Sequence, residues 1–328
     1  MKKIIIAGAS IAALAISAPA AAQSSSTVSQ TGNGNSADVA QDNANTSTIT
    51  QSGDNNDADV IQTIGTGNES TITQDASGSN EASVFQNGLN STSTVTQTSD
   101  ATDDVAIVVQ DVLSDDATAT ITQTGNGGGS SSNIALIDQD NGTGSTASIA
   151  QSGLSNIAET IQEGSDNLSD VLQTGLSGTV FVDQIGDNNT DLTIQGGDTN
   201  IADVNQGAVG AAVNGTTSTV FQGGDNNSAT VNQLADNNES FVDQGFSGGS
   251  LNIALVNQTG TGNFSGIEQG ASSVSNGNIA DVLQSGNDNA SFISQDGDTN
   301  SVNLDQTTDG NFSDVIQAGN GNSANVSQ

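Results

Sequence analysis

Residues 47–62 read Ser-Thr-Ile-Thr-Gln-Ser-Gly-Asp-Asn-Asn-Asp-Ala-Asp-Val-Ile-Gln, and this stretch contains the motif that decides the fold. Its two halves share one pattern: a small residue, any residue, an aliphatic residue, any residue and a glutamine. The pattern recurs from Ser26 to Gln328 and ends on 26 glutamines, most of them 11 residues apart. The aliphatic position departs from Val, Ile or Leu only at Thr160 and Thr193. Self-similarity at a fixed period indicates a repeat architecture.

The pattern has the period of a β-strand. Side chains of an extended chain alternate between two faces, so residues two apart point the same way. The small residue, the aliphatic residue, the glutamine and an asparagine six residues before it therefore share one face. Stretches such as Gly-Asp-Asn-Asn at 53–56 supply the residues that favour tight turns. Each repeat is thus expected to form one strand and one turn.

One strand cannot bury its own inward face, so two repeats are expected to form each rung of a stack. The sequence predicts an all-β fold, a cross-β β-solenoid with two strands per rung of about 22 residues and roughly 13 rungs. Asparagine then stacks on asparagine and glutamine on glutamine, and their amides bond along the stack. Longer glutamine spacings are interpreted as loop insertions at 110–123, 123–139, 206–222, 244–258 and 269–284.

The residues of this inward face are the predicted structural ladder of the stack. They are Asn35, Ala37, Val39, Gln41, Ser47, Ile49, Gln51, Asn56, Ala58, Val60, Gln62, Gln162, Asn167, Gln173, Gln184, Asn189, Gln195, Asn200, Gln206, Asn300, Gln306, Asn311, Gln317, Asn322 and Gln328.

The first 22 residues resemble a secretory signal peptide. Lys2 and Lys3 precede an apolar run over 4–16, and small residues follow up to Ala22. A transmembrane helix needs roughly 20 consecutive apolar residues, and nothing after residue 23 approaches that. We therefore expect a signal peptide at 1–22, a single solenoid domain at 23–328, and a secreted, extracellular chain that does not insert into a membrane.

Charge and composition exclude several classes of function. The chain has 37 acidic residues against two basic ones, and it has no histidine or cysteine. Proteins bind nucleic acids and anionic membranes through Lys or Arg side chains, so neither is an expected partner. Beyond residue 22 neither His, Cys nor Lys is present to serve as a catalytic base, thiolate or metal ligand. The sequence therefore predicts no enzyme, no catalytic residue and no cofactor.

The repeat resembles the curlin repeat on specific residues. One copy contains Ser47, Gln51, Gly53, Asn56, Ala58 and Gln62, and another contains Gln30, Gly32, Asn35, Ala37 and Gln41. The resemblance implies a structural subunit of curli, the extracellular amyloid fibres on the surface of Gram-negative bacteria, which support biofilm matrix, adhesion and aggregation. It also implies self-association end to end, a nucleator subunit and an outer-membrane secretion pore. Whether this chain is the major or the minor subunit stays open.

Three alternatives remain from the residues themselves. The first is that the same repeat forms a β-solenoid surface adhesin that never polymerises. The second is weak binding of divalent cations by carboxylate oxygens. Several acidic turn residues, such as Asp54 and Asp187, lie three residues after a repeat glutamine. Threonine pairs flank the inward aliphatic residue in every other repeat, which resembles the surface of ice-binding solenoids: Thr48/Thr50, Thr71/Thr73, Thr94/Thr96 and Thr120/Thr122.

Overall fold

A computed structural model describes residues 10–12, 23–75, 78–98, 103–125, 132–245, 248–270 and 274–328. The predicted signal peptide lies outside the described residues except for β1 (Ser10–Ala12), which pairs antiparallel with β2 (Ser25–Thr31). The described residues form strands and no helix, so none of them makes a membrane-spanning helix. The chain divides into two compact units, Met1–Asp166 and Asn167–Gln328, and each is described by itself.

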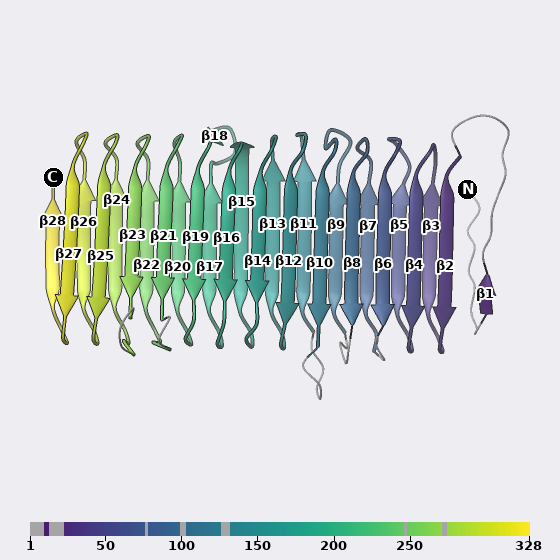
Figure 1. Ribbon diagram of the computed structural model, residues 1–328, viewed down its shortest axis with the longest axis horizontal. Helices are drawn as coiled ribbons and strands as arrows, with labels where there is room; N and C mark the ends of the chain where they lie inside the picture. The colour runs from purple at the N-terminus through teal and green to yellow at the C-terminus, as the bar shows by residue number, and fades with distance from the viewer. Residues whose placement is uncertain are drawn as a thin grey trace. The chain divides into compact units, whose positions relative to one another are not determined.

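In each unit, successive strands alternate between two parallel sheets, which we call sheet A and sheet B (Figure 1). Sheet A of the first unit contains β2, β4 (Thr46–Ser52), β6 (Glu69–Asp75), β8 (Thr92–Thr98), β10 (Thr118–Thr124) and β12 (Thr146–Ser152). Sheet B of the first unit contains β3 (Ser36–Gln41), β5 (Asp57–Gln62), β7 (Glu81–Gln86), β9 (Val105–Gln110), β11 (Ile134–Asp140) and β13 (Ile157–Glu163).

The second unit repeats this arrangement. Its sheet A contains β14 (Leu168–Gln173), β16 (Thr190–Gln195), β19 (Thr217–Gln222), β21 (Glu239–Gln244), β23 (Phe264–Gln269), β25 (Ala290–Asp296) and β27 (Phe312–Ala318). Its sheet B contains β15 (Thr179–Asp187), β17 (Ile201–Gln206), β20 (Ser228–Gln233), β22 (Ile253–Gln258), β24 (Ile279–Gln284), β26 (Ser301–Gln306) and β28 (Ser323–Ser327). The short β18 (Val213–Asn214) pairs with β15.

Each rung is one strand of sheet A followed by one strand of sheet B. The alternation of the sequence explains why two strands face each other. In β5 every second residue is buried and the others face solvent, so each strand has one face to bury against the opposite sheet. Ile49, Ala58 and Val60 are fully buried between the sheets. Removing such aliphatic side chains from water stabilises each rung by roughly 1.5–3 kcal/mol per large residue. The predicted all-β solenoid with two strands per rung is confirmed.

The turns use the positive-φ residues that the repeat supplies. Gly53 has φ 98° and Asn55 has φ 60°. Glycine is also required for space, since a Cβ on Gly32 would overlap the carbonyl oxygen of Gly53 in the next rung. Among the predicted insertions, the one after Gln206 contains β18. Parts of three others, at 126–131, 246–247 and 271–273, lie outside the described residues.

Candidate functional site

The inward glutamines form hydrogen-bonded ladders along each unit. In the first unit, Nε2 of Gln30 donates to Oε1 of Gln51 at 2.7 Å, and Gln51 donates to Gln74 at 2.8 Å. The second unit has the same direction of donation, for example from Gln306 to Gln328 at 3.1 Å. A neutral carboxamide can donate and accept at once, whereas an ionised glutamate can only accept. The ladder therefore requires a carboxamide and not a carboxylate at these positions.

The same amide nitrogens also bond across the core. Gln51 Nε2 donates to the carbonyl oxygen of Ser36 in the opposite sheet at 2.7 Å. In the second unit, Gln206 Nε2 donates to the carbonyl oxygen of Thr190 at 3.0 Å. Gln206 thus ties the two strands of its own rung together, Gln51 ties its rung to the preceding one across the core, and both glutamines also bond along their ladders to the next rung. Losing such a buried amide would leave its hydrogen-bond partners unsatisfied, and each unsatisfied partner would lower the free energy of unfolding by about 1–3 kcal/mol.

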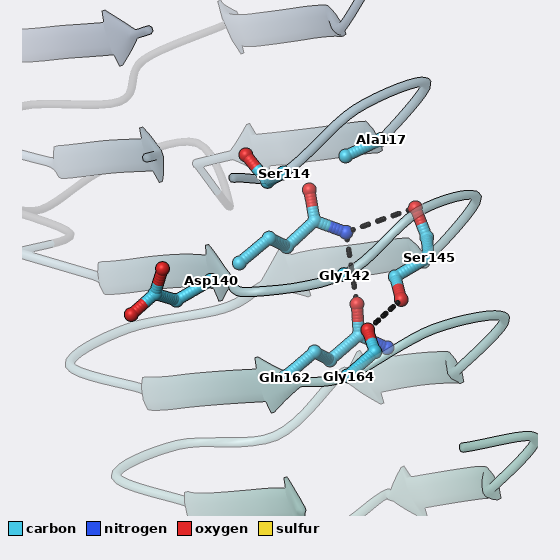
Figure 2. A pocket seen from close by; sticks show the side chains of 8 residues that line it. Ser114, Ala117, Asp140, Gly142, Ser145, Gln162 and Gly164 are labelled. Atoms are coloured by element: carbon cyan, nitrogen blue, oxygen red, sulfur yellow. Dashed lines mark hydrogen bonds between the residues drawn. The ribbon is translucent and has the colours of Figure 1, made fainter. Parts of the chain in front are cut away.

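Figure 2 shows these bonds in one part of the first unit. Gln139 Nε2 donates to Gln162 Oε1 at 2.8 Å and to the Ser145 carbonyl oxygen at 3.1 Å, and Ser145 Oγ donates to the Gly164 carbonyl oxygen at 3.0 Å. The recess that these residues line leaves no volume that a water molecule could occupy. The amides are therefore satisfied by protein atoms, and the recess is far too small for a substrate.

The asparagines form a second set of columns beside the turns. The backbone N–H of Asn56 donates to Asn35 Oδ1 at 3.0 Å, and that of Asn189 donates to Asn167 Oδ1 at 3.0 Å. Asn167 Nδ2 in turn donates to the carbonyl oxygen of Gly186 at 2.7 Å. Each asparagine therefore fixes the start of a strand and holds the turn of the neighbouring rung.

The family model of the curlin associated repeat matches residues 43–75, 217–245 and 297–328. Three segments of the chain match the curlin associated repeat. These segments contain β4 to β6, β19 to β21 and β26 to β28, so both units carry the repeat. The resemblance predicted from the sequence is confirmed. No match was found among curated proteins.

The predicted ladder residues lie on the inward faces or at the strand entries. Most of them are buried: Asn35, Ala37, Ser47, Ile49, Gln51, Asn56, Ala58, Val60, Gln62, Gln162, Asn167, Gln173, Gln184, Asn189, Gln195, Asn200, Gln206, Asn300, Gln306 and Gln317. Val39, Gln41 and Asn311 are partly exposed, and Asn322 and Gln328 are exposed. These five residues belong to the first and last described rungs, so the same chemistry is buried inside each unit and accessible at these two rungs.

The sheet B halves of the first and last described rungs are almost the same in sequence. Residues 30–41 and 317–328 differ only at Thr31/Ala318, Asp38/Asn325 and Ala40/Ser327. Their turns also share a conformation, with φ 104° at Gly32 and 96° at Gly319. In the described part of the chain, no further strand pairs with the outer edges of β3, β27 or β28. The sheet B strands of the two rungs present edges of matching chemistry.

The acidic turn residues bond to backbone N–H groups of neighbouring rungs. Asp225 Oδ1 accepts from the N–H of Asp198 at 2.9 Å. Elsewhere the column alternates with a neutral residue, because Asp187 N–H donates to Asn214 Oδ1 at 3.1 Å and Asn214 N–H donates to Asp236 Oδ1 at 2.8 Å. The described residues contain no group of three or more acidic side chains placed to hold a metal ion. Weak divalent-cation binding by these turns stays a prediction.

One buried carboxyl group was not foreseen from the sequence. Asp191 of β16 occupies the small-residue position, lies in register between Ser169 and Ser218, and is 1% exposed. Thr193, which replaces the aliphatic residue, donates from Oγ1 to the two carboxyl oxygens at 3.3 and 3.2 Å. Burial raises the pKa of Asp191 to about 7, and the charge of Asp170 adds to the rise, while hydrogen bonds from Thr193 and Ser218 oppose it. The signal in the sequence was Thr193, which stands where the repeat usually has an aliphatic residue.

Proposed function

We propose that this curlin-repeat chain is a structural subunit of an extracellular curli-like amyloid fibre that grows by stacking of terminal rungs. The observation that carries the proposal is the accessibility of Gln41, Asn322 and Gln328 at the outermost described rungs, where identical groups are buried in the interior. Strand edges of this kind template the addition of another chain.

The direction of the ladders defines how two copies would join. In both units the glutamine ladder bonds run from the Nε2 of one rung to the Oε1 of the next rung. Once residues 1–22, whose β1 pairs with this edge of β2, are removed, placing the first rung of a second copy after the last rung lets Gln317 donate to Gln30 and Gln328 donate to Gln41. The joint would then continue the cross-β spacing of about 4.8 Å.

Charge is expected to limit this assembly. The chain has a formal net charge of −35, so copies repel one another at neutral pH. Protonation of carboxylates removes that repulsion, and we expect fibres to form faster as the pH falls. The same acidic surface keeps unassembled chains apart.

The wider biology follows from the family. Curlin repeats support a non-catalytic role in biofilm matrix, surface adhesion and aggregation, with secretion through an outer-membrane pore and a separate nucleator subunit as partners. The filled core agrees with a structural role, because the space between the sheets is occupied by aliphatic side chains and paired amides.

The test compares two substitution pairs at the terminal rungs of residues 23–328. Gln41→Ala with Gln328→Ala removes ladder groups from both joining edges, while Ser36→Ala with Asn325→Ala changes exposed residues of the same two rungs. Elongation from preformed seeds, followed by thioflavin fluorescence, should slow strongly for the first pair and little for the second. A chain that stays monomeric at high concentration would instead identify a non-polymerising solenoid adhesin.

A further inference from the structure

The outward face of sheet A in the first unit is made of threonine. In four successive strands of this sheet, both residues that flank the buried aliphatic side chain are threonines, and all of them are at least partly exposed. We call these residues the threonine face: Thr48, Thr50, Thr71, Thr73, Thr94, Thr96, Thr120 and Thr122.

Parallel pairing in exact register arranges this face as two columns. Thr48 lies beside Thr71 of the next strand, and Thr50 lies beside Thr73. The same register continues through β8 to β10. Threonines therefore repeat at about 4.8 Å between strands and at about 6.7 Å along each strand, which makes a regular two-dimensional array.

The fold does not require threonine at these positions. In sheet A of the second unit the corresponding pairs are Leu192 with Ile194 in β16, and Phe241 with Asp243 in β21. Threonine is a favoured strand residue, but that preference acts equally on both units. This preference does not explain why eight threonines gather on the outward face of sheet A in the first unit and not on the same face in the second unit.

The chemistry of the threonine face restricts its ligand. The eight positions carry no charge in a chain whose formal net charge is −35. Each hydroxyl can donate and accept a hydrogen bond, and branching at Cβ restricts each side chain to few rotamers. The face is thus a stiff lattice of hydroxyl and methyl groups. It fits a ligand that is uncharged, periodic in two directions and able to both donate and accept.

We propose that the threonine face binds the surface of ice. An ice crystal is an uncharged lattice of water molecules that offers donors and acceptors at a similar repeat in two directions. A crystalline polysaccharide is the main competitor, but sugar rings bind through aromatic side chains, and the threonine face contains none. The proposal applies to a single copy and does not depend on fibre growth.

The decisive experiment measures enrichment of the protein, as residues 23–328, in slowly growing ice. Thr71→Tyr with Thr94→Tyr breaks the flat array at its centre. The matched control is Ser83→Tyr with Ile107→Tyr, because these residues lie in register at the same strand position in sheet B of the same rungs. Circular dichroism and thermal unfolding show that each variant folds.

We expect the wild type and the sheet B control to be enriched in ice and the T71Y/T94Y variant to lose most of that enrichment. If the tyrosine pair does not fold, Thr73→Val with Thr96→Val keeps the shape and removes the hydroxyls, and its enrichment should also fall below wild type. The proposal is overturned if wild type is not enriched, if the threonine-face variants match wild type, or if the face binds crystalline cellulose or chitin and not ice.

Discussion

The rung that begins with β16 and the next rung, which begins with β19, have the same backbone register and different interiors. β19 places Ser218 and Val220 inside, as the repeat predicts, while β16 places Asp191 and Thr193 at the same positions. Both strands nevertheless end in buried glutamines that share a ladder bond of 2.7 Å from Gln195 to Gln222. The comparison indicates that the amide ladders hold the register, whereas the small and aliphatic positions adjust stability and its dependence on pH.

The largest effect is expected from breaking the ladder that both rungs share. Gln222→Ala removes the donor to Gln244 at 2.9 Å and to the Ile201 carbonyl oxygen at 2.8 Å. It also leaves a cavity, so the free energy of unfolding should fall by about 3 kcal/mol. Urea denaturation measures the change. Thr219→Ala on the outward face of the same strand is the control and should change stability by less than about 1 kcal/mol.

A smaller effect of opposite sign is expected when β16 is converted to the pattern of β19. Asp191→Ser with Thr193→Val removes a buried carboxyl group and fills the aliphatic position, so the free energy of unfolding at pH 7 should rise by roughly 1–3 kcal/mol. Thermal unfolding should show a higher Tm for the double variant. An unchanged or lower Tm would mean that the buried carboxyl group is accommodated without cost.

The last expected effect is a difference in pH dependence between the same two proteins. The pKa of Asp191 is raised to about 7 in the folded state, above its value of about 4 in an unfolded chain. The folded state therefore holds the extra proton between these values, and stability is lost as the pH rises from about 4 through 7. Between pH 5 and pH 8 the wild type should lose more stability than D191S/T193V. Parallel stability curves for the two proteins would contradict the assignment.

Much of the fold could be predicted because the repeat specifies the same face again and again. A fixed spacing from Asn56 through Ala58 and Val60 to Gln62 determines which side chains point inward, and register then follows from stacking like on like. The bond from Gln51 Nε2 to the Ser36 carbonyl oxygen was not predictable, because it depends on the offset between the two sheets.

Other features depend on how insertions and single substitutions fit the stack. The residue beside Asp187 in the next rung is Asn214, because the insertion after Gln206 shifts the turn; spacing from the glutamine alone would have selected Val209. Asp191 was missed because its position usually tolerates polar residues such as Ser, and only the structure shows it fully enclosed. Such local exceptions follow from packing and not from the period.

In the proposed cross-β fibre, complementary terminal rungs join copies of this chain. Fibre diffraction from purified residues 23–328 tests it most directly. We expect filaments with a meridional reflection at about 4.8 Å, from strands perpendicular to the fibre axis. Monomers that remain in solution at high concentration and low pH, or filaments without that reflection, would contradict it.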